Sequence, residues 1–539
     1  MRKVFNFCGL WSYPLGVVIA GLLDYLLQIF KTQTYELTGE RIAALALAGL
    51  LMPVLIMALN TWDYFVNGRR DFSPSLSAKQ DVTGISSSKR KAMYPKISQE
   101  LLSSKPEGLI VGKYGKKYVR IPIDRRNIMN SITLGSPGSG KSAGIFLTTL
   151  INNFMKDRPD LTVFALDIKP ELARKSVKQG EDTNVKIVDF TDRGSYGWDV
   201  YYSLNENSTD DEKLRVFDGI TRAMIVSSNP KDAFFVNNAR TVMKGLLYYH
   251  YEKGSGFIDS ITAITSDDVI TQIKKALNDK EHCSENVSML LRKYADKESE
   301  AFQDIELTLQ EHLSIFMNSD VRFHMRDNPR KAAPEDLNHQ TSVFVCLPLH
   351  LLDEFQDILR LISYQTCSFC ESRGEDWETP VLMVLDELAR LGKLENLTSL
   401  LSVGRSKGIS VNMAFQDMSQ LEHIYSKEEA RTIFNLSEVT NVLSCKDNQT
   451  TREISDLIGE YKEEKISRNR SELLHTSDGK QHVSSEYRKI IETSDFQDLR
   501  KSQEAILIVE GKYYRVKQHR YYQDTILYKR YQEITEGVD

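Results

Sequence analysis

A glycine-rich loop between two apolar runs is the feature that most constrains what this chain can fold into. The loop, GSPGSGKS at residues 135–142, follows the apolar run 128–134 and precedes the apolar run 143–151. The order strand, loop, helix is the context in which a GxxxxGK[ST] pattern forms a phosphate-binding loop. We therefore predict an α/β fold that binds ATP or GTP; a glycine-rich turn without a ligand is the less favoured alternative.

The residue types of this loop are those that a polyphosphate requires. Glycines let the backbone curl so that successive N–H groups point inward. The lysine reaches the β- and γ-phosphates, and the hydroxyl after it binds Mg²⁺. The predicted nucleotide-binding residues are Gly135, Ser136, Pro137, Gly138, Ser139, Gly140, Lys141 and Ser142.

A second strand supplies the carboxylates that hydrolysis requires. Residues 380–385 form a continuous apolar run, typical of a central parallel strand, and Asp386 and Glu387 follow it directly. Ligands of open α/β sheets bind outside the carboxyl ends of the strands, so both side chains are predicted to face the phosphates. Asp386 would share Mg²⁺ with Ser142, and Glu387 would orient and polarise the attacking water. A solvated loop start is the alternative for such an acidic pair.

Further strands and helices alternate along the chain, which predicts a doubly wound, mostly parallel sheet. The predicted strands span residues 161–167, 185–190, 341–347, 409–415 and 439–444. Between residues 205 and 328 the pattern is almost entirely helical, so we predict an all-helical domain inserted into the nucleotide-binding domain. Residues 504–517 are predicted to form an antiparallel hairpin that turns at Gly511 and Lys512.

The amino-terminal region is predicted to anchor the chain in a lipid bilayer. The apolar stretches 4–30 and 42–66 are each long enough for a membrane helix. Basic residues precede the first stretch and follow the second, which places both ends of a two-span hairpin in the cytoplasm. Asp24 either ends the first span or faces the inside of a helix assembly. A cleaved signal peptide is disfavoured because no small-residue cleavage site follows the first stretch.

Composition limits the remaining possibilities. With 539 residues the chain is too long for one ordinary core. Its net charge of −5 gives no overall attraction to nucleic acid, so any DNA contact must be local. The six cysteines are too scattered for a disulfide framework, which fits a reducing cytosol, and the lone CxxC at Cys367 and Cys370 does not favour zinc.

These patterns together predict the domain organisation. The chain would begin with a transmembrane hairpin at residues 1–68 and a cytoplasmic tether at 69–106. The nucleotide-binding domain would comprise residues 107–204 and 329–460, with the helical domain 205–328 between them. A charged mobile segment at 461–500 and a β-hairpin with a tail at 501–539 would complete the chain.

In this order, the features resemble the coupling proteins of conjugative type IV secretion systems, the TraG-like membrane ATPases. The resemblance covers nearly the whole chain, and its most specific motifs are the loop 135–142, LDEL at 385–388, GRSKG at 404–408 and Phe415-Gln416. It implies a RecA-like motor that forms a hexamer, hydrolyses ATP with Mg²⁺, and brings relaxase-bound single-stranded DNA to the type IV secretion channel.

Two further catalytic residues follow from this resemblance. Gln416 resembles the glutamine that senses the γ-phosphate, although a polar strand end would look the same. Arg405 lies in the glycine-flanked loop 404–408, and we predict that it completes the site of a neighbouring subunit. The phosphate loop supplies only one cation, Lys141, and the helix before Arg405 should carry it away from its own carboxylate strand toward the sheet edge. The match is looser at residues 167–171 (DIKPE instead of DPKGE) and at Trp198.

Three function classes remain open at this stage. The first is an ATP-driven translocase at a conjugation pore, and the second is a docking receptor whose nucleotide site only controls assembly. The third is a membrane AAA-type chaperone or protease, although the sequence contains no HExxH pattern, which argues against a zinc protease. Hydrolysis of ATP stimulated by DNA would separate the first class from the others.

Overall fold

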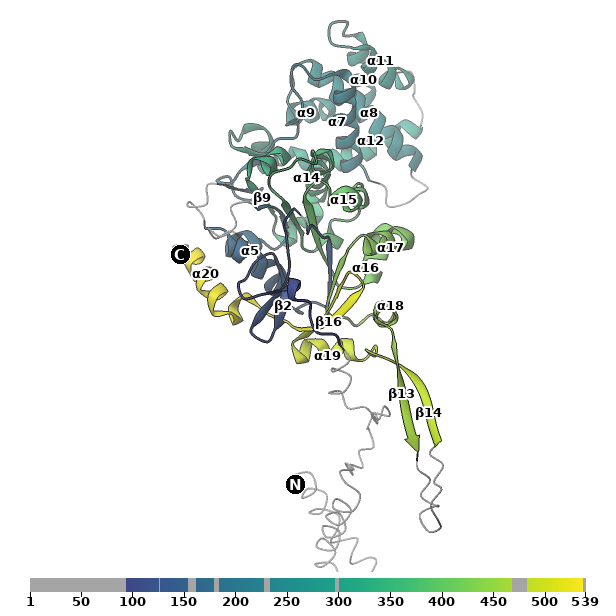
Figure 1. The fold of residues 1–539 in the computed structure, drawn as a ribbon. Coiled ribbons are helices and arrows are strands. Elements are labelled where there is room, and N and C mark those ends of the chain that lie inside the picture. The colour runs from purple at the N-terminus through teal and green to yellow at the C-terminus, as the bar shows by residue number, and fades with distance from the viewer. Residues whose placement is uncertain are drawn as a thin grey trace, which may run out of the picture. The chain divides into compact units, whose positions relative to one another are not determined.

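The computed structural model describes residues 94–125, 127–153, 161–178, 184–226, 233–295, 300–467 and 482–536 (Figure 1). The predicted transmembrane hairpin at residues 1–68 lies outside these ranges. Within them, no helix combines the length and the apolar character that crossing a membrane requires.

A single mixed sheet organises the described residues. Its strand order is β1-β3-β2-β16-β15-β12-β4-β11-β10-β5-β9-β6. The strands from β12 to β6 in this order run parallel to one another. They are β12 (Val439–Ser444), β4 (Ser131–Gly135), β11 (Ile409–Phe415), β10 (Val381–Leu385), β5 (Thr162–Asp167), β9 (Ser342–Cys346) and β6 (Val185–Asp189).

Two hairpins extend the sheet with antiparallel strands, and the sequence predicted the second of them, at residues 504–517. The strands involved are β1 (Leu102–Ser103), β2 (Leu109–Tyr114), β3 (Lys117–Ile121), β15 (Glu504–Val509) and β16 (Lys512–Lys517). The second hairpin turns at Glu510 and Gly511, with φ of 48° and 76°, and not at Gly511 and Lys512 as predicted. A two-residue turn of this kind requires positive φ at both positions, and the sequence reading shifted it by one residue.

The central strands are buried on both faces, and their side chains alternate between two cores. In β10, Leu382 and Val384 join one core, while Val381, Met383 and Leu385 join the other. The first core is covered by η2 (Ser142–Phe146), α5 (Leu147–Asn153), α6 (Leu172–Ser176) and α20 (Thr525–Thr535). The second is covered by α14 (Leu352–Ser372), α15 (Leu397–Val403), α16 (Met418–Tyr425), α17 (Lys427–Asn435) and α18 (Asn448–Ile458) (Figure 1). The α/β architecture with a mostly parallel sheet is thereby confirmed.

A helical insert separates β6 from β9, as the sequence predicted. The short strands β7 (Gly197–Trp198) and β8 (Lys331–Ala332) pair with each other at its base. Its main helices are α7 (Asp210–Met224), α8 (Ala233–Glu252), α9 (Phe257–Ser266), α10 (Val269–Asn278), α11 (Glu285–Leu291) and α12 (Glu300–Leu313). The isoleucines and threonines of α9 have low helix propensity, and burial of Ile261 and Ile264 stabilises this helix instead.

The charged segment 461–500, predicted to be mobile, contains regular structure where the structure describes it. Strand β13 (Glu460–Ser467) pairs antiparallel with β14 (His482–Lys489), and α19 (Asp495–Ser502) follows. The expectation of a mobile or partly ordered loop did not include these two strands and this helix. Tyr461 of β13 packs against the core, whereas Tyr487 of β14 is 68% exposed, so this ribbon lacks the regular apolar alternation that usually signals a strand.

Candidate active site

The loop 135–142 curls tightly between β4 and the helix that begins at Ser142. Gly138 and Gly140 have φ of 71° and 101°, a region that glycine adopts without a steric penalty. A Cβ atom on Gly135 would collide with Ser139 Oγ, so this position also needs glycine. The N–H of Ser136 donates to Ser444 O at 3.3 Å, which fixes the loop to the end of β12.

Lys141 and Ser142 direct their polar atoms toward the interior of the site. The side chain of Lys141 is nearly buried, and its Nζ donates to Gly135 O at 2.5 Å, so the ammonium lies inside the loop. Burial lowers the pKa of Lys141, while the charges of Glu387 and Asp386 oppose this. Ser142 Oγ donates to Asp386 Oδ2 at 2.6 Å. The fold thus brings together the two residues predicted to hold Mg²⁺.

Asp386 fits a cation that takes oxygen ligands. Burial raises its pKa, which the hydrogen bond from Ser142 opposes. Its Oδ1 atom is buried and has no hydrogen-bond partner among the described residues. Such an orphaned carboxylate oxygen suits Mg²⁺, which uses one or two protein oxygens together with phosphate and water. Within the described ranges no group of three or more His, Cys, Asp or Glu side chains forms an all-protein metal site.

Glu387 lies beside Asp386 in a left-handed conformation, with φ of 60° and ψ of 31°. Its Oε1 is 2.7 Å from Lys169 Nζ, and its Oε2 is 3.8 Å from Arg390 Nε. Burial raises the pKa of Glu387, but the positive charges of Lys169, Lys141 and Arg390, with Lys169 foremost, together hold this pKa below its ordinary value. The carboxylate therefore stays ionised, as a group that polarises water requires. The sequence showed Lys169 after a neighbouring strand but did not predict this contact.

Gln416 lies at the same edge of the sheet, between the loop and the carboxylates. It directly follows β11, which has β4 on one side and β10 on the other. Phe415 pairs with Leu134 in the sheet. The residues that follow them, Gln416 and Gly135, therefore lie side by side at the carboxyl ends of the two strands. The N–H of Gln416 donates to Gln420 Oε1 at 2.9 Å.

Arg405 lies at the opposite edge of the sheet. Its turn joins α15 to the amino end of β11, and Gly408 O in this turn accepts from Val381 N, the first residue of β10, at 2.8 Å. The seven residues of β11 therefore separate Arg405 from the phosphate loop, a length of about 23 Å. The expectation that α15 carries Arg405 away from its carboxylate strand toward the sheet edge is wrong, because α15 joins the carboxylate strand β10 to its direct neighbour β11, in the middle of the sheet. Arg405 instead lines an open cavity of about 640 Å³ with Arg125 and Trp377.

Two arginines from the carboxyl-terminal part of the chain approach the phosphate loop. Arg500 Nη1 donates to Pro137 O at 3.3 Å. Arg520 Nε lies 3.2 Å from the position of a Cβ atom on Gly140. Lys141 is the only cation that the loop itself supplies, and these two arginines add positive charge beside it from the same subunit. Their separation from the loop, 363 positions for Arg500 and Pro137, left no local signal in the sequence.

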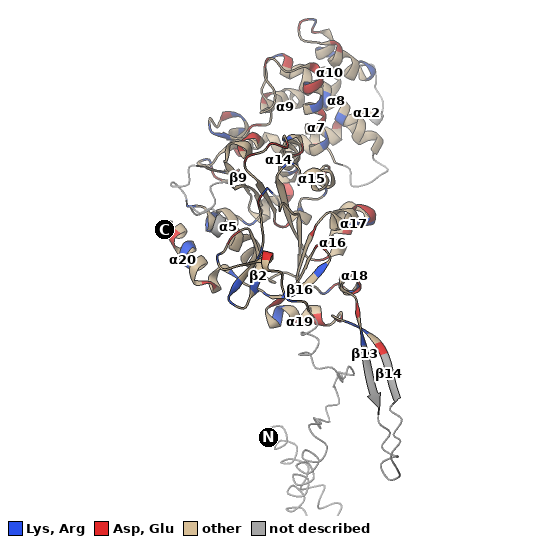
Figure 2. Ribbon diagram, viewed as in Figure 1, with Lys and Arg blue, Asp and Glu red and all other residues tan. Residues whose placement is uncertain are grey.

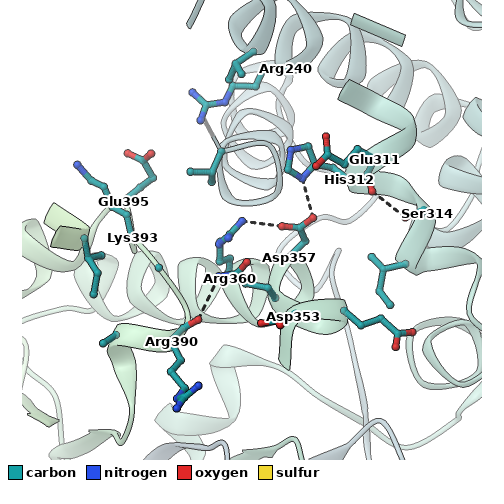
Figure 3. A pocket seen from close by; sticks show the side chains of 18 of the residues that line it. Arg240, Glu311, His312, Ser314, Asp353, Asp357, Arg360, Arg390, Lys393 and Glu395 are labelled. Carbon is teal, nitrogen blue, oxygen red and sulfur yellow. Dashed lines mark hydrogen bonds and ion pairs between the residues drawn. The ribbon is translucent and has the colours of Figure 1, made fainter. Parts of the chain in front are cut away.

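A cavity of about 1200 Å³ lies between the helical insert and the segment after Glu387 (Figure 3). In its wall, His312 Nδ1 of α12 lies 2.8 Å from Asp357 Oδ2 of α14. The second oxygen of Asp357 accepts from Arg360 Nη1 at 2.8 Å, and Arg360 Nε donates to Leu391 O at 3.1 Å. A continuous set of hydrogen bonds thus links the insert to the segment that begins with Glu387.

The sequence of this chain is similar to those of known proteins. A family model described as "Type IV secretory system Conjugative DNA transfer" matches residues 78–538. The type IV secretion system-coupling protein VirD4 of Bartonella henselae is 26% identical over 180 residues, which cover 33% of this chain and 28% of that protein. The conjugal transfer protein TraG of Agrobacterium fabrum is 23% identical over 222 residues, 38% of this chain and 33% of the relative. The matched stretch thus spans at most a third of these relatives.

Solved structures show the same fold. The bacterial conjugative coupling protein TrwBdeltaN70 in its unbound form has a TM-score of 0.60 at 16% identity, covering 81% of this chain and 91% of that chain. The plasmid coupling protein TrwB in complex with ADP and Mg²⁺ has a TM-score of 0.56 at 17% identity, covering 81% and 92%.

Proposed function

Because the chain belongs to the type IV secretory system conjugative DNA transfer family, we propose that it is a membrane-anchored ATPase of a type IV secretion system. In this proposal it recruits relaxase-bound single-stranded DNA and helps to move it into the secretion channel. The observation that carries the proposal is the convergence of Ser142, Asp386 and Glu387 at the end of the phosphate loop.

The chemistry proposed for this site is hydrolysis of ATP. The loop and Lys141 hold the β- and γ-phosphates, and Ser142 and Asp386 hold Mg²⁺. When bound, the cation offsets the negative charge of the phosphates. Glu387, kept ionised by Lys169, orients the attacking water and accepts its proton, and Gln416 helps to place this water.

We propose that the nucleotide domain is a RecA-like motor that assembles as a homo-hexamer. The position of Arg405 supports this, since it lies at the sheet edge opposite to its own phosphate loop and lines an open cavity. In a ring with head-to-tail contacts, one subunit presents this edge to the phosphates of the next. Arg405 then stabilises the charge that develops on the γ-phosphate of the neighbour.

The helical insert is proposed to bind the cargo, whether relaxase or DNA. The hydrogen bonds from His312 through Asp357 and Arg360 give it a direct connection to the segment after Glu387. Basic and acidic residues are interspersed along the insert (Figure 2), so contact with DNA would be local. The two apolar stretches before residue 68 are proposed to hold the chain in the cell membrane with the ATPase domain in the cytoplasm.

Measurement of ATP hydrolysis by the full chain in detergent, with and without single-stranded DNA, tests the proposal. We expect turnover that rises with DNA and is lost in Glu387→Gln. Nucleotide binding without turnover under either condition would instead support a docking receptor. Turnover that responds to unfolded protein but not to DNA would support an AAA-type chaperone.

A further inference from the structure

Arg520 is an arginine beside the phosphate loop with no ion-pair partner among the described residues. Its Nε lies 3.2 Å and its Cγ 3.9 Å from the positions of Cβ atoms on Gly140 and Gly144, respectively. Its Nη1 donates to Tyr522 OH at 2.6 Å, and the guanidinium lies 5.9 Å from the centre of the same ring. The guanidinium is open to solvent, has no carboxylate partner among the described residues, and lies beside Gly140 of the loop and Gly144 of the following helix, so it is suited to an anionic ligand.

The fold holds the backbone of Arg520 in place through the residues on either side of it. The side-chain Nε2 of Gln518 donates to Leu443 O at 2.8 Å and to Glu504 O at 3.0 Å. His519 Nε2 lies 2.8 Å from Oδ2 of Asp524, which is buried. The backbone of Arg520 is therefore held in place independently of the contacts of its side chain.

Strand direction explains why this segment returns to the loop. Strand β15 runs antiparallel to β12, and β16 runs antiparallel to β15. Lys517, the last residue of β16, consequently pairs with Glu504, the first residue of β15, at the same edge of the sheet as the phosphate loop. The chain reaches this edge twice. Arg500 lies there just before β15, and Arg520 lies there just after β16.

The order of the strands indicates which part of a nucleotide Arg520 faces. Strands β12 and β15 lie on one side of β4, whereas β11 and β10 lie on the other. Asp386, Glu387 and Gln416 all belong to the second side, which is the side of Mg²⁺ and the γ-phosphate. Since a nucleotide extends through the loop from its γ-phosphate to its nucleoside, the first side receives the α-phosphate and the nucleoside.

We propose that Arg520 binds the α-phosphate of the nucleotide, with its guanidinium held against Tyr522. This inference rests on the proposed function, since it assigns a residue to the same site. Arg520 would increase the affinity for ATP and ADP alike, because both contain an α-phosphate. It would thus act on nucleotide binding, in contrast to Glu387, which acts on turnover.

Displacement of a fluorescent ADP analogue from the full chain in detergent tests this assignment. Unlabelled ADP and pyrophosphate, both with Mg²⁺, serve as competitors. Pyrophosphate carries only two phosphates, and when these lie at the β and γ positions beside Lys141 the α position would be left empty. Arg520→Ala is expected to weaken ADP about tenfold or more and to leave pyrophosphate within about twofold, whereas Lys141→Ala should weaken both.

Two further variants complete the test. Arg520→Lys keeps the charge but loses the planar fork, so an intermediate ADP affinity is expected. Lys529→Ala removes an exposed positive charge from α20 and should leave both affinities unchanged. An unchanged ADP affinity in Arg520→Ala, or an equal loss for ADP and pyrophosphate, would overturn the inference. If the unaltered chain bound no ADP, the proposed function itself would fail.

Discussion

Ser142 Oγ lies 2.6 Å from Asp386 Oδ2, although 244 positions separate these residues in the sequence. Ser142 opens the helix after the phosphate loop, and Asp386 follows β10. One strand, β11, lies between β4 and β10, so the two side chains meet beyond its carboxyl end. A hydroxyl and a carboxylate at this distance form a pair of oxygen ligands of the kind that Mg²⁺ binds.

Lys141 and Glu387 should separate nucleotide binding from hydrolysis. Lys141→Ala is expected to abolish binding, because it removes the ammonium inside the loop. Glu387→Gln should keep binding and lower turnover about 100-fold or more, since an amide cannot accept the proton of water. Equilibrium binding of ATP and steady-state phosphate release measure the two effects. Glu428→Gln, an exposed glutamate of α17, is the matched control, and parental turnover in Glu387→Gln would refute the assignment.

Lys169 should set the pH dependence of hydrolysis. Its ammonium lies 2.7 Å from Glu387 Oε1 and lowers the pKa of this carboxyl, so Lys169→Met should raise that pKa. Because the reaction needs the ionised carboxylate, the acid limb of the kcat/KM profile should move to higher pH. Lys169→Arg should keep most of the parental profile. Lys175→Met, which removes a lysine paired with Glu171, should not shift it, and an acid limb that stays in place in Lys169→Met would contradict this role.

Arg405 should act on the neighbouring subunit. Arg405→Ala and Glu387→Gln are each expected to be inactive as pure oligomers. When both are mixed in one oligomer, some interfaces combine an intact Glu387 with an intact Arg405 from the neighbour, so hydrolysis should partly return. Phosphate release by mixtures whose co-assembly is confirmed measures this effect. A mixture no more active than its components would indicate that Arg405 does not act in trans.

Asp357 should transmit the state of the insert to the catalytic segment. Asp357→Asn weakens the contacts to His312 and Arg360, so it is expected to reduce stimulation by single-stranded DNA. Turnover without DNA should stay within about twofold, because Asp357 does not contact the phosphate site. Asp353→Asn lines the same cavity (Figure 3) and serves as the control. Equal stimulation in Asp357→Asn and the parent would argue against this connection.

Asp524 should stabilise the segment that positions Arg520. The buried carboxylate accepts hydrogen bonds from Lys113, Tyr118 and His519, and it caps α20. Removing its charge leaves buried donors poorly paired, so Asp524→Asn should cost about 3 kcal/mol of unfolding free energy. Urea unfolding measures this loss, and Asp498→Asn, at an exposed ion pair, should change stability by less than about 0.5 kcal/mol.

Asp524 should also make the free energy of unfolding depend on pH. Burial raises the pKa of Asp524, but the hydrogen bonds from His519 and Lys113 outweigh burial and hold this pKa well below its ordinary range. A carboxyl whose pKa is depressed by folding contributes stability above its unfolded-state pKa of about 4. This contribution is lost as the pH falls further, so the difference between the parent and Asp524→Asn should shrink below about pH 4.

By itself, the sequence determined the parts of the protein whose geometry depends on residues close together in the chain. The curl of the loop requires glycines at 138 and 140, and the carboxylates Asp386 and Glu387 follow an apolar run that reads as a buried strand. Alternation of strands and helices was sufficient to predict the α/β sheet and its helical insert. The family model that matches residues 78–538 confirms the resemblance to type IV secretion coupling proteins.

Only the tertiary structure decided which distant residues meet. Lys169 reaches Glu387 because β5 is the neighbour of β10, and Arg520 reaches Gly140 because β16 returns to the edge of the phosphate loop. Arg405 lies at the opposite edge because α15 joins adjacent strands. Local periodicity tells a strand from a helix and a buried face from an exposed one, but strand order depends on packing among all the layers at once. For that reason the sequence predicted Lys141 at this site, whereas only the tertiary structure showed that Lys169, Arg500 and Arg520 also lie there.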